Sequence, residues 1–181
     1  MDPMHPSVMI DQLNDLPNMI RNVVQDFDWG EKSARRAITT LEYLSVNRVI
    51  VSGCGDSYHA ALASEMAFES IGGVACEPYN GLRLLDYAID QISAPFPGDP
   101  FIVGVSVSGT TARVVSMIER AKTRGHFTVA VTGNAESALA TAADRYVSSE
   151  IPFIGRSPGI RTYTASLMAL YMMASRIGEL Q

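Results

Sequence analysis

Strand-like and helix-like segments alternate from residue 48 onward, and this alternation limits the fold more than any other feature of the sequence. The first strand, RVIVSG at 48–53, is a continuous apolar run with β-branched residues, which is typical of a strand buried on both faces. The pattern predicts four more strands, at 74–80, 101–109, 126–134 and 146–151. Strands that alternate with helices connect by right-handed crossovers, so we expect an α/β fold: a parallel sheet inside a three-layer αβα sandwich.

Helical segments account for most of the remaining chain. They are expected at 57–73, 82–89, 110–125, 137–145 and 161–178, and the proline-containing segments 94–100 and 152–159 are predicted to be loops. Two helices precede the first strand: one spans 10–27 and should start or kink at Pro17, and an amphipathic one spans 31–44. We therefore divide the chain into N-terminal helices at 1–46 and a domain at 47–181.

Composition argues against several classes of protein. The chain is 47% hydrophobic with a net charge of -5, which does not fit a disordered protein, and no Lys/Arg cluster would follow nucleic-acid phosphates. No apolar run approaches the ~20 residues of a membrane span, and the N-terminus lacks the pattern of a signal peptide. The two cysteines and three histidines have no metal-ligand spacing. We expect a cytoplasmic protein with reduced thiols that uses no metal or cofactor and binds neither nucleic acid nor membrane.

Two loops of small polar residues form a candidate ligand site. Residues 52–57 follow the first strand, residues 106–111 follow the third, and each loop leads into a helix. Free N–H groups at a helix start bind anions, and glycines let the backbone approach the ligand closely. Ligands of such sheets bind beyond the carboxyl ends of the strands. Two neighbouring loops of this kind would therefore form a phosphate cup without a lysine.

The alternative is that Ser, Thr and Asp in these loops only cap helices. Neither loop has a nucleotide signature: Tyr58 stands where a dinucleotide fingerprint has its third glycine, and no Gly-Lys-Ser/Thr sequence occurs. A flavodoxin-like domain that binds FMN or a nucleotide thus remains an interpretation without a supporting motif.

Three motifs carry a resemblance to a known family. CGDSYH at 54–59 begins an alanine-rich helix, SVSGTT at 106–111 is similar to a Ser-Gln-Ser-Gly-Glu-Thr loop, and GIRTYT at 159–164 is similar to a Ser-Thr-Lys-Ala-Phe-Thr segment. In this order they resemble the sugar isomerase (SIS) domain, most closely the first isomerase lobe of glucosamine-6-phosphate synthase-like phosphosugar isomerases and deglycases. The resemblance implies a five-stranded, flavodoxin-like parallel sheet between helices.

The resemblance also implies a ligand and the residues that hold it. A phosphorylated sugar or amino sugar would contact Gly55 and Ser57 of the first loop. From the second loop it would contact Ser106, Val107, Ser108, Gly109 and Thr111. Val107 replaces the family's glutamine and retains only its backbone N–H, and Arg161 stands where the family has a lysine.

Catalytic residues are harder to assign than phosphate-binding ones. Aldose–ketose isomerisation needs a base that moves a proton between adjacent carbons, and an acid that opens the ring. Glu150 is the one glutamate that we expect at the carboxyl edge of the sheet; otherwise it is a solvated loop carboxylate. His59 would open the ring, or is a packed or capping histidine. Asp56 either caps its helix or contacts the ligand, and Cys54 is either a reactive thiol or a small residue that fills the turn.

Two functions therefore remain open. The resemblance implies part of an isomerase or deglycase that acts on a sugar phosphate, and the alternative is a sugar-phosphate-sensing domain without catalysis. The synthase-like enzymes of the family use two lobes in tandem, whereas this sequence holds one. We therefore expect a homodimer or a partnership with a second SIS lobe.

Overall fold

Five parallel strands form the centre of the structure, a computed structural model that describes residues 6–93, 99–155 and 157–181. The sheet has the order β2–β1–β3–β4–β5. The strands are β1 (Arg48–Gly53), β2 (Ala75–Asn80), β3 (Phe101–Val105), β4 (Phe127–Thr132) and β5 (Arg145–Ser148). All five predicted strands are confirmed, and their order is that of flavodoxin-like sheets.

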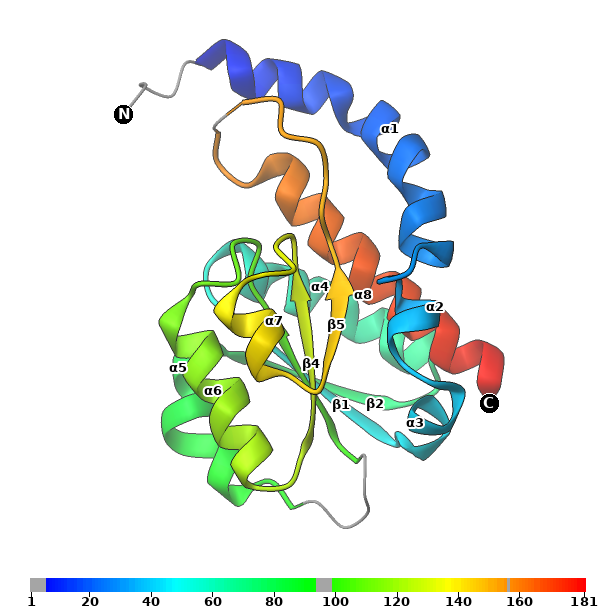
Figure 1. Ribbon diagram of the computed structural model, residues 1–181, viewed down its shortest axis with the longest axis vertical. Helices are drawn as coiled ribbons and strands as arrows, with labels where there is room; N and C mark the ends of the chain where they lie inside the picture. The colour runs from blue at the N-terminus through cyan, green and yellow to red at the C-terminus, as the bar shows by residue number, and fades with distance from the viewer. Residues whose placement is uncertain (1–5, 94–98, 156) are drawn as a thin grey trace.

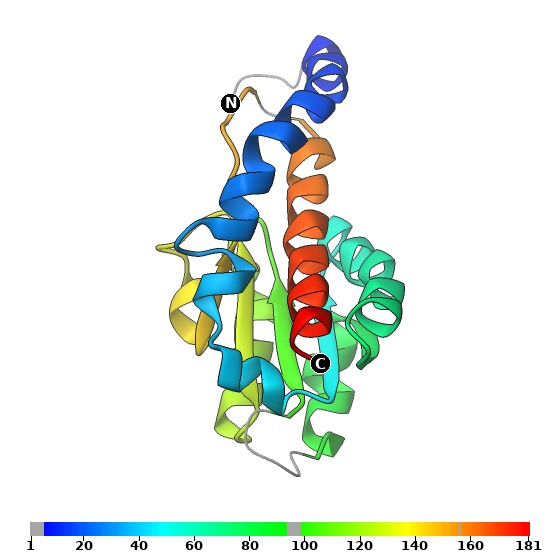
Figure 2. The same ribbon diagram turned by 90° about the vertical axis from the view of Figure 1, so that its right-hand side faces the viewer.

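Helices cover both faces of the sheet and complete the expected three-layer αβα sandwich (Figures 1 and 2). One face packs against α4 (Asp56–Ser70) and α8 (Ile160–Leu180). The other packs against α6 (Ala112–Thr123), α7 (Ala138–Ala142) and a helical segment made of α5 (Gly81–Arg83), a π turn η1 (Leu84–Ala88) and a 3-10 turn η2 (Ile89–Gln91).

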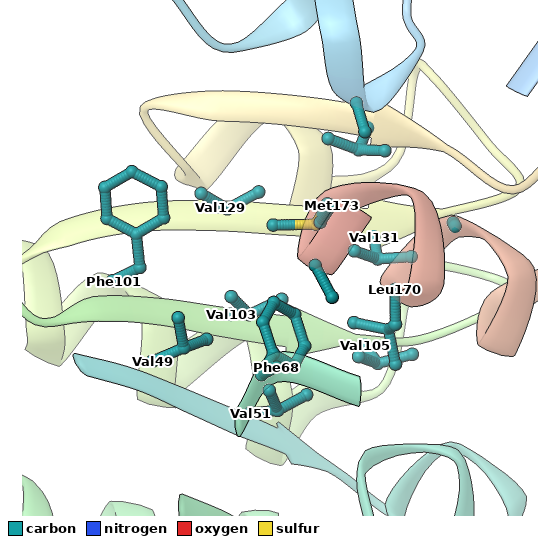
Figure 3. Close-up of a cluster of buried hydrophobic side chains, with 14 of the residues drawn as sticks. Val49, Val51, Phe68, Phe101, Val103, Val105, Val129, Val131, Leu170 and Met173 are labelled. Atoms are coloured by element: carbon teal, nitrogen blue, oxygen red, sulfur yellow. The ribbon is translucent and has the colours of Figure 1, made fainter. Parts of the chain in front are cut away.

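Alternate strand residues supply the two halves of the core. Figure 3 shows valines of β1, β3 and β4 facing Phe68 of α4 and Leu170 and Met173 of α8. Ile50 and Ile102, from positions between those valines, instead pack against Met117 and Ile118 of α6. Because both faces are buried, the central strands are apolar over most of their length, which is why the sequence pattern identified them.

The N-terminal helices differ from the prediction. α1 (Pro6–Trp29) runs through Pro17, so it does not start there; the kink predicted as the alternative stays a prediction at that residue, although α1 bends along its length (Figure 2). Pro17 is exposed, so water can reach the carbonyl that loses its helical partner there. The single helix expected at 31–44 is wrong: α2 (Ala34–Ala37) and α3 (Thr40–Ser45) replace it, because Thr39 and Glu42 form a capping box that starts a new helix.

Loop predictions are tested in part. The proline segment 94–100 lies mostly outside the described residues, so its loop prediction is not tested. In the segment 152–159 the described residues form a loop, and Arg156 lies outside the described residues. Within the described ranges, none of the helices combines the length and the apolarity that crossing a membrane requires.

Helix α1 extends past the carboxyl end of the sheet and lies beside the loop that leads into α8 (Figure 1). Two polar contacts fix it there: the Gln12 side chain donates to the Gly155 carbonyl at 2.9 Å, and Asp15 pairs with Arg161 at 3.0 Å. This loop and the start of α8 border the cleft described next, so α1 supports one of its walls.

Candidate functional site

A cleft of about 320 Å³ opens at the carboxyl end of the sheet, where the loops after the neighbouring strands β1 and β3 meet. It is lined by Cys54, Asp56, Ser57, Ser106, Val107, Ser108, Thr111, Gly159, Thr162, Tyr163 and Ser166. From β1 the chain crosses to β2, whereas from β3 it crosses to β4 on the opposite side. The cleft therefore lies at the topological switch point, where parallel α/β sheets bind ligands.

The loop after β3 is stabilised by pairs of its own hydroxyl groups. Ser106 Oγ and Thr111 Oγ1 lie 2.9 Å apart, as do Ser108 Oγ and Thr110 Oγ1. Gly109 has a φ of +65°, and a Cβ there would collide with the Ser137 side chain at the start of α7. The loop thus rests on α7 in a conformation that only glycine permits at this close contact.

The helices that begin at the cleft have no side-chain cap. The residues at the N-cap positions of α4, α6 and α8 are Gly55, Thr111 and Gly159, and none of them makes a capping hydrogen bond. In contrast, the side chains of Thr39, Asn80 and Ser137 cap α3, α5 and α7. Capping therefore does not explain the small polar residues of the two loops, and three helix starts present their partial positive charge to one cleft.

Most residues predicted to bind the ligand lie together. Five of the seven line the cleft: Ser57, Ser106, Val107, Ser108 and Thr111. Gly55 and Gly109 do not line it. With φ values of +56° and +65°, they turn the chain within the two loops that do.

The two catalytic candidates lie elsewhere. Glu150 is exposed and lines a separate hollow of about 820 Å³, between α1 and the segment that follows β5. His59 is exposed on α4, with its ring centroid 6.0 Å from that of Tyr58, and it is not among the residues of the cleft. Their catalytic roles therefore stay predictions that the geometry of the cleft does not support.

Arg161 points away from the cleft, although the sequence placed it in the position of the family's lysine. Its side chain is 6% exposed, pairs with Asp15 of α1 and donates to the Pro152 carbonyl at 2.7 Å. Sequence periodicity could not predict the direction of the Arg161 side chain, because its partner Asp15 is distant in the sequence.

Three cleft residues on α8 were not identified from the sequence: Thr162, Tyr163 and Ser166. The signal was present, because positions 162 and 166 are separated by one helical turn and lie on the same face. Ser166 is 1% exposed, and its Oγ has no hydrogen-bond partner within the described residues.

The two thiols differ in their surroundings. Cys54 is partly exposed at the cleft, whereas Cys76 is buried in β2, and burial raises the pKa of its thiol to about 12. Among the residues that the structure describes, no group of three or more His, Cys, Asp or Glu could hold a metal ion.

A family model for the SIS domain matches residues 42–176. Two similar relatives are both named glutamine–fructose-6-phosphate aminotransferase (isomerizing). The protein of Gloeobacter violaceus is 24% identical over 177 residues, which cover 96% of this chain and 28% of that protein. The protein of Aquifex aeolicus is 28% identical over 174 residues, which cover 94% of this chain and 27% of that protein. The chain therefore spans little more than a quarter of the length of these relatives.

Solved structures share the fold. The C-terminal domain of glucosamine-fructose-6-phosphate aminotransferase from Francisella tularensis matches with a TM-score of 0.80 and 17% identity, over 97% of this chain and 49% of that one. A protein of Escherichia coli CFT073, solved in complex with a ligand, matches with a TM-score of 0.73 and 20% identity, over 98% of this chain and 93% of that one.

Proposed function

Because the chain belongs to the SIS domain family, we propose that its cleft binds the phosphate group of a phosphorylated sugar or amino sugar. One observation carries the proposal: three helices without side-chain caps, α4, α6 and α8, begin at this cleft. Each helix start favours an anion by about 0.3–1 kcal/mol at low salt. Together the helix starts oppose the net charge of -5, which by itself would repel a phosphate, although the Asp56 carboxylate in the first turn of α4 offsets part of the contribution of that helix.

The loop residues divide the work of binding. Ser57, Ser106, Ser108 and Thr111 would donate hydroxyl hydrogen bonds to phosphate oxygens, and Val107 would contribute only its backbone N–H. Gly55 and Gly109 would keep the two loops in the conformation that aims these donors. Hydrogen bonds to a charged acceptor contribute about 1.5–3 kcal/mol each, so the loss of two hydroxyl groups should be easy to detect.

We further propose that the domain forms part of a sugar-phosphate isomerase or deglycase. The names of the relatives, which describe isomerizing aminotransferases, support this reading. A second candidate function, sugar-phosphate sensing without catalysis, is favoured by the composition of the cleft. Among its described lining residues Asp56 is the one carboxylate, and no His, Glu or Lys stands beside it to complete an acid–base pair for proton transfer.

The incomplete acid–base pair suggests that a partner completes the site, either a second copy of the chain or a second SIS lobe. Helix α1 offers a surface for this contact, since the apolar residues Ile10, Leu13, Ile20 and Val24 are exposed on it at helical spacing. In this proposal residues 1–46 pack on the domain at 47–181 and contribute to the partner interface. We also propose that the protein is cytoplasmic, needs no cofactor, and binds neither nucleic acid nor membrane.

Calorimetric titration with a panel of sugar phosphates tests phosphate binding. The wild type should bind at least one of them, and the double variant Ser106→Ala/Ser108→Ala should bind it at least tenfold more weakly, which is about 1.4 kcal/mol. The matched control is Ser45→Ala, which removes a hydroxyl outside the cleft that bonds only to the Glu42 carbonyl. The proposal fails if the wild type binds none of the panel, or if the double variant binds as tightly as the wild type. Assay of the same panel for turnover separates an isomerase from a sensor.

A further inference from the structure

Asp56 is the one charged side chain among the described residues that line the cleft. The nearest cation along α8, Arg161, is already paired with Asp15 and turned away. A bound phosphate would therefore share the cleft with a carboxylate that no cation among the described residues neutralises.

The position of Asp56 is fixed by the start of α8. Its Oδ2 lies 2.6 Å from the point where a Cβ on Gly159 would stand, so the carboxylate rests against the Gly159 backbone. It does not cap α4, and no hydrogen bond or ion pair of this carboxylate occurs within the described residues. A free carboxylate at a ligand cleft is available to a donor on the ligand.

Ser166 independently indicates that the same wall of the cleft meets a polar ligand group. Its hydroxyl is almost fully buried, lines the cleft and has no partner in the described part of the chain. A buried hydroxyl without a hydrogen bond is costly, so such a group in a native protein usually has a partner, whether protein, water or ligand. In contrast, the hydroxyls of the opposite wall are paired with one another, as in Ser106 and Thr111.

We infer that the natural ligand carries a primary ammonium group as well as a phosphate, and that Asp56 selects for this ammonium group. The inference rests on the proposed function. Like charges repel, so the phosphate should sit towards the Ser106–Thr111 loop and the ammonium group towards Asp56. Ser166 would hydrogen-bond a neighbouring hydroxyl or the amine itself. Asp56 is thus a specificity-determining residue for phosphorylated amino sugars over neutral sugar phosphates.

Two ligand pairs that differ only in the amine test this selection. The first is glucosamine 6-phosphate against glucose 6-phosphate, and the second is 1-amino-1-deoxyfructose 6-phosphate against fructose 6-phosphate. By calorimetry at low salt, the wild type should prefer the amine in at least one pair by roughly threefold to tenfold, the range of a partly exposed ion pair. The preference should shrink as salt is added.

Variants separate the charge of Asp56 from its shape. Asp56→Asn should weaken binding of the amine ligand and leave unchanged or strengthen binding of the neutral one, because a negative charge near the phosphate has been removed. Ser166→Ala should weaken binding of the amine ligand without changing the salt dependence of the preference. Asp86→Asn makes the same chemical change on the exposed surface of η1, outside the cleft, and should alter neither affinity.

The outcomes distinguish this inference from the proposed function. If both members of each pair bind equally, or if Asp56→Asn keeps the full preference, Asp56 does not select an amine and only this inference is overturned. If no sugar phosphate of either pair or of the wider panel binds, the proposed function fails and the inference fails with it.

Discussion

Arg161 of α8 and Asp15 of α1 form an ion pair across two segments that are distant in the sequence, with 3.0 Å between Nε and Oδ2. The guanidinium is nearly buried, since the Arg161 side chain is 6% exposed, whereas Asp15 is 33% exposed. The pair attaches α1 to the first turn of α8, next to the cleft residue Thr162. It therefore links the stability of the N-terminal helix to the geometry of the candidate ligand site.

Removal of the Asp15 carboxylate should show how much it costs to bury the Arg161 guanidinium without a counter-charge. Asp15→Asn leaves a nearly buried guanidinium without its counter-charge, so we expect the free energy of unfolding to fall by about 2 kcal/mol in urea titrations. Glu77→Gln breaks a more exposed pair with Arg48, 3.3 Å apart, and should change stability by less than about 0.5 kcal/mol. Equal losses in the two variants would mean that burial of Arg161 contributes nothing.

Two hydroxyl deletions should separate capping from ligand binding. Thr39→Ala removes a real cap of α3 and should cost about 1 kcal/mol of stability without affecting ligand affinity. Ser57→Ala removes a cleft hydroxyl that caps no helix and should leave stability within about 0.5 kcal/mol, while sugar-phosphate affinity falls roughly tenfold. Urea titration measures the stability of both variants, and calorimetry measures their affinity for the sugar phosphate. If Ser57→Ala loses as much stability as Thr39→Ala, the Ser57 hydroxyl acts as a helix cap and not as a ligand contact.

Two glycines with similar backbone angles provide a matched test of the loop after β3. Gly125 has a φ of +83° and open space around a Cβ, so Gly125→Ala should cost only the conformational penalty, about 1–2 kcal/mol. Gly109 has a φ of +65°, and an alanine there would also collide with Ser137. Gly109→Ala should therefore cost clearly more in urea unfolding and weaken ligand binding as well. Indistinguishable losses would show that α7 does not support the loop.

The two cysteines should react at very different rates in the native protein. Iodoacetamide should modify Cys54, which is partly exposed at the cleft, and spare Cys76, whose burial raises its thiol pKa to about 12. A bound sugar phosphate should slow modification of Cys54. Mass spectrometry of native and urea-unfolded samples measures this, with the unfolded chain as the control in which both thiols react. Fast labelling of native Cys76 would contradict the buried position of β2.

Stability should fall on the acid side of neutrality because of His126. Burial lowers the pKa of this ring below its ordinary 6.5, and the charges of Arg48 and Arg124 add to the effect, although the Ile92 carbonyl opposes it. The unfolded state therefore binds the proton more readily than the folded state. As a result, the free energy of unfolding should decrease as the pH falls below about 6.5 and stay level above about 7.5.

His126→Leu supplies the comparison for that pH profile. The variant should lose the part of the slope that lies below about pH 6.5, measured by urea unfolding at several pH values. Wild type and variant should run parallel above about pH 7.5. An unchanged slope in the variant would assign the acid sensitivity to other groups.

Burial explains how far the sequence could predict this fold. Strands such as RVIVSG are covered on both faces, so their apolar runs were visible without any tertiary information. The two loops of the candidate site were also identifiable, because small polar residues after two such strands must meet at one edge of a parallel sheet. Five of the seven residues predicted to bind the ligand line the cleft as a result.

The errors come from local chemistry and from side-chain direction. The Thr39–Glu42 capping box outweighed a helical pattern that ran across it, and this signal was present in the sequence. In contrast, the sequence carried no signal for the direction of the Arg161 side chain. That direction depends on the Asp15 carboxylate of α1, whose position does not follow from hydrophobic periodicity. The same holds for Ser166, whose place at the cleft follows from the angle at which α8 meets the two loops.

The three uncapped helix starts also bear on how this site can change over generations. A main-chain N–H remains after almost any side-chain replacement, so the backbone part of the proposed anion site tolerates many substitutions around it. If the proposed function holds, residues such as Val107, Asp56 and Ser166 can vary and redirect the cleft to a different sugar, while the backbone part of the affinity for the phosphate persists. In this proposal, proteins that share this arrangement of helix starts could acquire new ligands through single substitutions and still keep their backbone contacts to the phosphate.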